Sequence, residues 1–205
     1  METYVNQFWS YFNTVRYDIQ EAFEKQDKTA LKLFVKKLTL KISKINDKLD
    51  LILNLSDNEK HSLIICIHKN TQLKPIQNQL INNAPYIDNW SFEAGVKPYS
   101  KKQPMGFYFE HKNMVVLSDQ VFIHLYKIYN SSNKLHIHVY FDLGISGVAK
   151  YQLKDLANYV LLFYLGDTLF YEHISRIKVV RRRLKSVNFI PLHELKHLIE
   201  FKSPY

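Results

Sequence analysis

The amino-acid sequence predicts an α+β fold with an N-terminal helical hairpin and a mostly antiparallel sheet whose helices pack on one side. Two observations lead to this prediction. Apolar residues recur at helical spacing through residues 4–49, and short β-type runs then follow in blocks that do not alternate strictly with helices. Because strict alternation marks a parallel α/β sheet, the blocks favour an antiparallel sheet covered by helices.

Two long helices are predicted at the start of the chain, over residues 4–25 and 28–49. Apolar residues three or four positions apart share one face of each helix. The lysines of the second segment flank its apolar stripe on both sides, as solvated cover does. We expect an antiparallel hairpin joined near Asp27. The two stripes consist of Phe8, Tyr11, Phe12, Val15, Ile19 and Phe23, and of Leu31, Phe34, Leu38, Ile42, Ile45 and Leu49.

The remainder of the chain predicts strands and shorter helices, in one compact domain over residues 1–205 or in two closely packed halves, 1–100 and 101–205. A helix should end before Pro85, because the residue that precedes a proline resists the helical conformation. Gly166 is expected to interrupt another helix, and Pro191 suits the first turn of the last one. Strands are expected at 51–55, 62–68, 90–96, 106–111, 114–117, 121–128, 134–142 and 175–184, a hairpin loop at 130–133, and helices at 71–83, 152–164 with a continuation to 173, and 191–201.

The composition excludes several classes of protein. Hydrophobic residues make up 46% of the chain and charged residues 23%, which allows a sizeable core and argues against disorder. The single cysteine, Cys66, cannot form an internal disulfide, and its apolar neighbours indicate a buried, inert thiol. The N-terminus lacks a signal-peptide pattern, and the longest apolar run, 159–165, is too short to span a bilayer. We expect a cytoplasmic protein with no membrane insertion and no cofactor.

The net charge of +9 at pH 7 lies mostly in the second half of the chain, where residues 176–185 contain six basic residues and no acidic one. One interpretation is a solvated edge strand that charge protects against aggregation. The other is a patch that binds a polyanion: nucleic acid, an acidic protein or an anionic membrane surface. The patch consists of Arg176, Lys178, Arg181, Arg182, Arg183 and Lys185.

Residues 193–197, HELKH, match the H-E-x-x-H signature of zinc metalloproteases. Histidines at i and i+4 share a helix face and can ligate zinc, and the glutamate activates the metal-bound water. Here Pro191 places the string at a helix start, and Lys196 puts a cation beside the second histidine. Only eight residues follow the string, and Glu200 is the one carboxylate among them. The context favours a surface helix over a zinc site.

A second histidine cluster is predicted on neighbouring strands. His136 and His138 alternate with apolar residues, so both should point to one face of a strand, with His124 on the strand before it. An H-x-H pair can bind a metal ion. The same alternation is typical of an ordinary half-buried strand, which is the favoured interpretation, because no cysteine or acidic cluster joins the histidines at ligand spacing.

Other catalytic patterns are absent from the sequence. It contains no glycine-rich phosphate loop and no G-x-S-x-G elbow, and its carboxylates are few and scattered, so no acid–base pair stands out. Aromatic residues make up 14%, and residues 107–109, near Lys101 and Lys102, form the best candidate platform for stacking the bases of single-stranded nucleic acid. Core packing is the alternative explanation for most of these rings.

Four short blocks follow one another over nearly the whole chain: Phe8-Trp9 with Tyr11-Phe12, Ala84 to Trp90, Leu165-Gly166-Asp167 with Ile174, and Ile190 to Leu195. In this order they resemble the blocks of a group of uncharacterised bacterial proteins, a domain of unknown function. That group has an N-terminal tryptophan helix, an A-P-x-x-x-x-W block, an L-G-E block and a closing P-L-x-E-L helix. This chain has Asp167 in place of the glutamate. The resemblance implies no catalytic residue and makes Glu194 part of a structural helix start.

Together these patterns predict a non-enzymatic binding or regulatory module whose partner is a protein that meets the basic second half of the chain. The alternative is a nucleic-acid-binding protein that uses residues 176–185. A third, disfavoured hypothesis is a zinc-dependent hydrolase at His193, Glu194 and His197.

Overall fold

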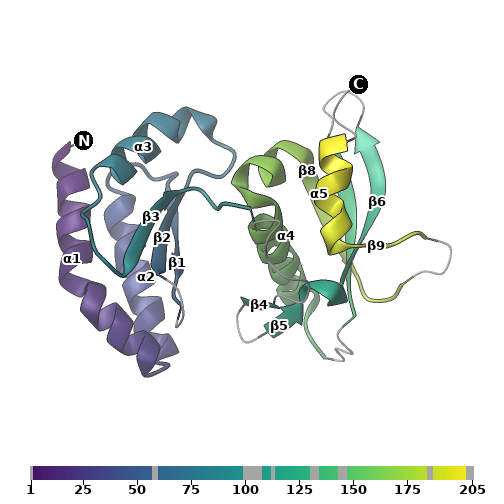
Figure 1. Ribbon diagram of the computed structural model, residues 1–205, viewed down its shortest axis with the longest axis horizontal. Helices are drawn as coiled ribbons and strands as arrows, with labels where there is room; N and C mark the ends of the chain where they lie inside the picture. Colours follow the sequence, from purple (N-terminus) through teal and green to yellow (C-terminus); the bar gives the residue numbers. More distant parts are fainter. Residues whose placement is uncertain are drawn as a thin grey trace. The chain divides into compact units, whose positions relative to one another are not determined.

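The computed structural model describes residues 2–56, 60–98, 108–111, 114–129, 134–142, 147–183 and 187–201. The chain divides into two compact units, Met1–Val96 and Lys97–Tyr205, called the first and the second unit below. Each unit combines helices with a sheet that contains antiparallel strands, which confirms the predicted α+β class (Figure 1).

The first unit opens with the predicted helical hairpin, α1 (Glu2–Glu24) and α2 (Lys28–Ile42), which lie side by side in Figure 1. Asp27 starts α2, because its carboxylate accepts hydrogen bonds from the backbone N–H groups of Thr29 and Ala30 at 3.0 and 2.9 Å. The second helix ends earlier than predicted. The Asn46 side chain accepts a hydrogen bond from the N–H of Lys48, a local turn that competes with helix continuation.

The sheet of the first unit contains β1 (Asp50–Asn54), β2 (His61–Cys66) and β3 (Trp90–Ala94), in the order β1-β2-β3. Strand β1 pairs antiparallel with β2, and β2 pairs parallel with β3. A parallel pair needs a crossover, and here η1 (Thr71–Leu73) and α3 (Lys74–Asn82) supply it. The predicted helix over 71–83 therefore begins with a tight 3-10 turn.

Aromatic rings fill the core of the first unit between the hairpin and the sheet. Trp9 and Phe12 of α1 meet Phe92 edge to face, with ring centroids 4.7 and 5.4 Å apart. The indole N–H of Trp9 donates to the carbonyl oxygen of Leu80 at 2.9 Å, which ties α1 to α3. A buried indole needs such a partner, because an unsatisfied donor is costly in the interior.

An ion pair at the edge of this sheet should give the first unit a pH-dependent stability. The Asp50 carboxylate lies 3.4 Å from Nε2 of His68, which occupies a φ of 49°. The hydrogen bond from His68 lowers the pKa of Asp50. Partial burial acts in the opposite direction and raises this pKa, and the hydrogen bond from the N–H of Leu51 lowers it further. A lowered folded-state pKa stabilises the fold above the unfolded value of about 3.9, and this contribution disappears as the pH falls through the folded value.

We expect Asp50→Asn to cost about 0.2–1 kcal/mol at mildly acidic to neutral pH, a small effect because the pair is half exposed. Asparagine keeps the acceptor for Leu51 and removes only the charge. Urea titrations of both proteins at a series of pH values test this prediction. The difference should vanish below the pKa of folded Asp50, and a difference that is constant with pH would contradict it.

The described part of the second unit contains two sheets, the helices α4 and α5, and the short 3-10 helix η2. A short hairpin precedes a four-stranded sheet in the order β8-β7-β6-β9, and both helices follow the central pair of strands in the chain (Figure 1). The elements are β4 (Tyr108–His111), β5 (Met114–Leu117), η2 (Ser118–Gln120), β6 (Val121–Tyr129), β7 (Lys134–Phe141), α4 (Lys150–His173), β8 (Ile174–Val180), β9 (Ile190–Pro191) and α5 (Leu192–Phe201).

The two units share a strand arrangement that the sequence did not indicate. In the second unit, β6 pairs antiparallel with β7, and β7 pairs parallel with β8 through the crossover helix α4. This repeats the pairing of β1, β2 and β3 around α3. The three-stranded and the four-stranded sheet are therefore both mixed sheets, in which one parallel strand joins antiparallel ones.

Helices α4 and α5 and the β4–β5 hairpin share one hydrophobic core with the four-stranded sheet. Gly166, at φ 75° and ψ 165°, divides α4 into two segments, which confirms the predicted interruption. Pro191 does not lie in the last helix as predicted. It pairs with Phe122 in the short strand β9, and α5 begins one residue later. The basic strand β8 ends at Val180, before the arginine triplet.

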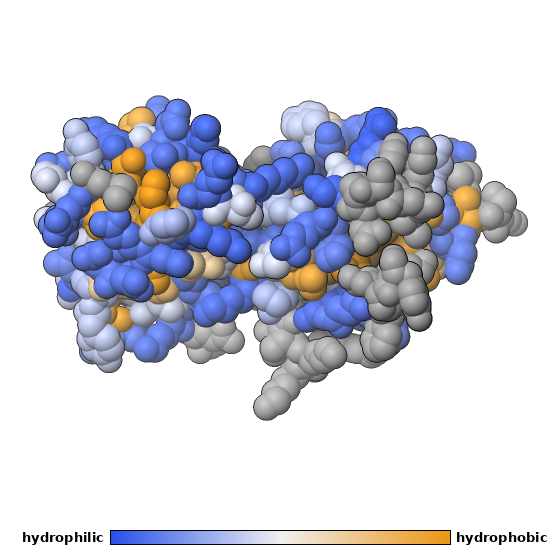
Figure 2. Space-filling view, turned by 90° about the horizontal axis from the view of Figure 1, so that it is seen from above, coloured by the Kyte–Doolittle hydropathy of each residue, from blue (hydrophilic) through white to orange (hydrophobic). Residues whose placement is uncertain are grey.

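Hydrophilic residues cover most of the surface visible in Figure 2, with smaller hydrophobic areas between them. Within the described ranges, no helix is long and apolar enough to cross a membrane. Tyrosines are prominent among the large exposed side chains: Tyr4, Tyr17, Tyr86, Tyr126 and Tyr151. Of these, Tyr126 lies on the four-stranded sheet of the second unit.

Candidate binding surface

One face of the four-stranded sheet of the second unit packs on the hydrophobic core, and the described side chains of the other face are half-buried or exposed. Along β7, residues alternate between buried and half-buried, with Ile137 and Val139 in the core. His136 and His138 point to the opposite face, as the alternation predicts. We call this surface the sheet face and define it by Tyr126, His136, His138, Arg176 and Lys178.

Strand register brings the basic residues of β8 beside the histidines of β7. His136 lies opposite Arg176, and His138 lies opposite Lys178. Both basic side chains are exposed. On the other side of β7, His124 of β6 lies opposite His138, and their ring centroids are 5.8 Å apart.

Tyr126 lies almost flat on His138. The ring centroids are 4.7 Å apart, and the ring planes are inclined by 19°. A register shift between Leu125 and Lys127 produces this position, because a β-bulge inserts one unpaired residue and turns its side chain. Tyr126 is 63% exposed although one face of its ring is covered. The bulge therefore presents a supported aromatic ring to solvent.

The electrostatic environment of the sheet face is positive. Partial burial, followed by the charge of Lys178 and the neighbouring His124, lowers the pKa of the His138 imidazole. A neutral imidazole stacks on the phenol ring of Tyr126 without desolvation of a charge. Within the described residues, Arg176 and Lys178 have no ion pair with a carboxylate. The face therefore combines cations with rings.

The segment that follows β8 closes one end of this surface. The guanidinium of Arg183 lies over the ring of Phe122, 4.3 Å from its centroid, and donates to the carbonyl oxygen of Phe189 at 3.3 Å. The carbonyl oxygen of Asn188 lies 3.0 Å from Nδ1 of His124. Phe189 is buried, with its ring 5.6 Å from that of His124. This end is packed and hydrogen-bonded, whereas Tyr126, further along β6, is mostly exposed.

The six basic residues predicted as one patch do not form one surface. Arg176 and Lys178 lie on the sheet face, and Arg183 packs at its closed end. Arg181 donates to the carbonyl oxygen of Val148, in the segment that leads into α4. Arg182 is exposed in the bend after β8, and Lys185 lies outside the described residues.

Strand β8 lies at the edge of its sheet, which confirms the predicted edge position but not the role of its charge. The sequence did not indicate the aromatic part of the surface. Residues 107–109 were the expected stacking platform, but Phe109 is 2% exposed in the core and residue 107 lies outside the described residues. The alternation of Phe122, His124 and Tyr126 in the sequence was the signal that could have identified it.

The HELKH string occupies the first turns of α5. His193, Glu194 and His197 are all exposed. The backbone carbonyl of His193 accepts a hydrogen bond from the Tyr164 hydroxyl at 2.9 Å. Lys196 is partly exposed, and its amino group lies 3.9 Å from the carboxylate of Glu200.

Neither histidine cluster gathers a set of metal ligands. In the part of the chain that the structure describes, no group of three or more histidine, cysteine, aspartate or glutamate side chains is arranged to hold a metal ion. This holds for HELKH and for His124, His136 and His138. A catalytic zinc site uses three protein ligands, so the geometry gives the hydrolase hypothesis no support.

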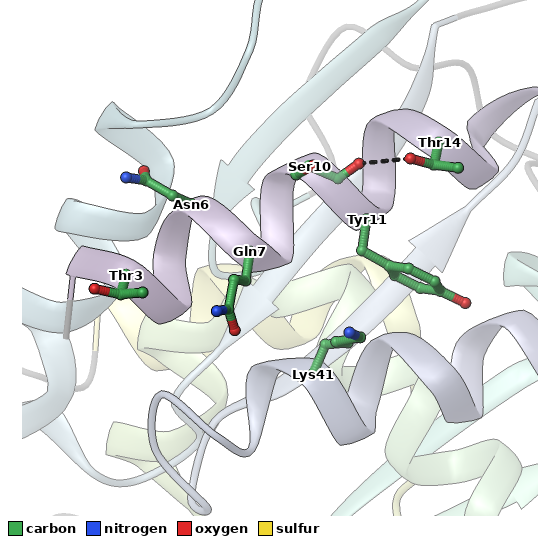
Figure 3. Close-up of a pocket in the computed structure, with 7 residues that line it drawn as sticks. All are labelled: Thr3, Asn6, Gln7, Ser10, Tyr11, Thr14 and Lys41. Carbon is green, nitrogen blue, oxygen red and sulfur yellow. Dashed lines mark hydrogen bonds between the residues drawn. The ribbon is translucent and has the colours of Figure 1, made fainter.

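A shallow groove of about 600 Å³ lies between α1 and α2 (Figure 3). The Lys41 amino group lies 5.1 Å from the centroid of the Tyr11 ring, and the Thr14 hydroxyl donates to the carbonyl oxygen of Ser10 at 3.0 Å. Apart from Lys41, the lining is uncharged, so the groove offers no acid–base pair for catalysis. Its lining consists of Thr3, Asn6, Gln7, Ser10, Tyr11, Thr14 and Lys41.

Comparison of the chain with protein-family models, with curated proteins and with solved structures gave no match. A function can therefore be inferred only from the chemistry and geometry of the described residues.

Proposed function

We propose that this chain is a non-enzymatic binding module and that the sheet face of its second unit binds nucleic acid. The observation that carries the proposal is the pair Arg176 and Lys178, which are exposed on one face and have no ion pair within the described residues. Such cations are available to phosphates, and the release of counterions from the nucleic acid favours binding. We expect the protein to act in the cytoplasm.

Protection of an edge strand is a competing explanation for charge on β8. It accounts for Arg176 and Lys178 taken alone. It does not account for the exposed ring of Tyr126 two strands away on the same face. The net charge of +9 adds a long-range field that attracts a polyanion. The two explanations differ in what removal of the two cations should do.

The double variant Arg176→Gln/Lys178→Gln should weaken binding to labelled oligonucleotides about tenfold or more and reduce the slope of log K against log salt by about 1–2. Fluorescence anisotropy at several salt concentrations measures both quantities. The matched control is Lys36→Gln/Lys37→Gln on exposed positions of α2, which removes the same charge from the first unit. This control should bind nearly as the unaltered chain does.

Two outcomes would contradict the proposal. If neither single- nor double-stranded oligonucleotides are retained at physiological ionic strength, the face does not bind nucleic acid. If the double variant binds normally but aggregates, the cations only protect the edge of the sheet.

An acidic protein partner, which the sequence alone favours, is the second candidate. The observation in its favour is the closed end of the face, where Arg183 lies on Phe122 beside Phe189. Arginine and aromatic residues are enriched in the cores of protein interfaces. An acidic partner should lose affinity on Arg183→Ala as well as on Arg176→Gln/Lys178→Gln. This candidate would be favoured if Arg183→Ala lowers the affinity for an acidic protein and the unaltered chain binds no oligonucleotide.

A further inference from the structure

Resting on the proposed function, we infer that the ligand is single-stranded nucleic acid and that one of its bases stacks on the exposed face of Tyr126. The sheet face offers a ring and cations at once, and this combination is typical of surfaces that bind single strands. The two cations by themselves attract the phosphates of single strands and duplexes alike.

The geometry of Tyr126 supports the stacking step. Its ring lies on the imidazole of His138 at 4.7 Å and 19°, so its inner face is occupied and its orientation is held. The side chain is nevertheless 63% exposed, which leaves the outer face to solvent. A ring that is already held in place loses little conformational freedom when a base stacks on it.

The strand order places the phosphate-binding groups beside this ring. Tyr126 lies on β6 and the two cations on β8, with His138 of β7 between them. Two strand spacings amount to about 10 Å, and the long side chains of Arg176 and Lys178 shorten the gap. The two cations are two residues apart on one strand, about 6.6 Å, so they can contact neighbouring phosphates. A strand that crosses the sheet can therefore meet the ring and the cations together.

A duplex cannot use this surface in the same way. Its bases are stacked and paired, and only their edges are accessible in the grooves. A four-stranded sheet whose other face is covered by helices is too broad to enter a groove as a helix or a two-stranded ribbon does. Open sheets with exposed aromatic side chains instead stack the unpaired bases of single strands. Because every base has a π-face, we expect little preference for base sequence.

The first arm of the test uses the unaltered full chain. Anisotropy titrations compare a labelled oligothymidylate and oligouridylate with a blunt duplex of the same length, about 16 nucleotides. Both single strands should bind at least tenfold more tightly than the duplex. Equal affinity for single strands and duplex would overturn the inference and leave the proposed function standing. If none of the probes binds, both the inference and the proposed function are contradicted.

The second arm uses two substitutions at the ring. Tyr126→Leu should weaken single-strand binding about tenfold, because stacking on one base is lost, and should leave duplex binding unchanged. Tyr126→Phe keeps the ring and should bind within about twofold of the unaltered chain. An equal loss of affinity for single strands in both variants, or no loss of affinity in either, would contradict stacking. The exposure of Tyr126 favours normal folding of both variants, and the first arm does not depend on them.

Discussion

Replacement of Phe12 by alanine should lower the free energy of unfolding of the first unit by about 3–5 kcal/mol. Phe12 has no exposed surface. Its ring meets Trp9, Trp90 and Phe92 edge to face, at centroid distances of 6.0, 4.9 and 5.4 Å. Alanine would remove the transfer free energy of the ring and leave a cavity among three rigid neighbours, which cannot easily collapse. The favourable edge-to-face contacts would be lost as well.

Tryptophan fluorescence in a urea titration measures this effect selectively, because both tryptophans of the chain, Trp9 and Trp90, belong to the first unit. The control is Thr14→Ala, at an exposed position two residues further along α1, which should change the stability by about 0.5 kcal/mol or less. If Phe12→Ala shifts the midpoint no further than Thr14→Ala does, the aromatic cluster does not hold the hairpin on the sheet.

Gly166→Ala should destabilise the second unit by about 1–3 kcal/mol. Gly166 is buried within α4 at φ 75° and ψ 165°. This conformation is accessible essentially to glycine alone, because any Cβ meets the adjacent backbone. The kink redirects the chain between two segments that both contribute to the core, through Leu165 and Phe170. Alanine must either adopt the strained conformation or straighten the helix and displace one of these contacts.

Far-UV circular dichroism in urea titrations tests this prediction, because α4 is a long helix of the second unit. Thr168→Ala, two residues further along at an exposed position, is the matched control and should be neutral or slightly stabilising through helix propensity. Gly166→Asn should not rescue stability, because asparagine tolerates the left-handed helical region but not a ψ near 165°. Wild-type stability of Gly166→Ala would show that the kink is not required.

Local patterns predicted most of the helices and strands. The spacing of Phe8, Phe12 and Ile19 predicted the first helix, and these side chains are fully buried in the structure. The alternation around His136 and His138 predicted which residues of β7 face outward. Such patterns succeed because helix and strand periodicity place every third or fourth, or every second, residue on one face whatever the partner is.

The ends of the helices and the order of the strands in the sheets are harder to predict from the sequence. The second helix was predicted to run to residue 49 because the apolar spacing continues, but a turn at Asn46 ends it and Leu49 is buried at the start of β1. Pro191 was placed in the last helix, because a proline suits a first helical turn as well as the edge strand that it occupies.

In the sheet face, too, local patterns predict some features, and contacts between distant residues determine the others. Charge identified Arg176 and Lys178, and alternation identified the histidines. The sequence did not separate these two cations from Arg181, which turns to the carbonyl of Val148, because the path of the chain after β8 depends on contacts with distant residues. The stacking of Tyr126 on His138 depends on a β-bulge in a pairing between two strands.

The sequence alone determined the α+β class, the N-terminal hairpin, the interruption at Gly166 and the outward direction of the β7 histidines. These features follow from interactions between residues close in the chain. Only the tertiary structure decided that β8 joins β7 in parallel, that Tyr126 lies on His138 and that HELKH gathers no third ligand in the described part of the chain. Strand register and ligand geometry join residues far apart in the sequence, and local spacing carries no information about them.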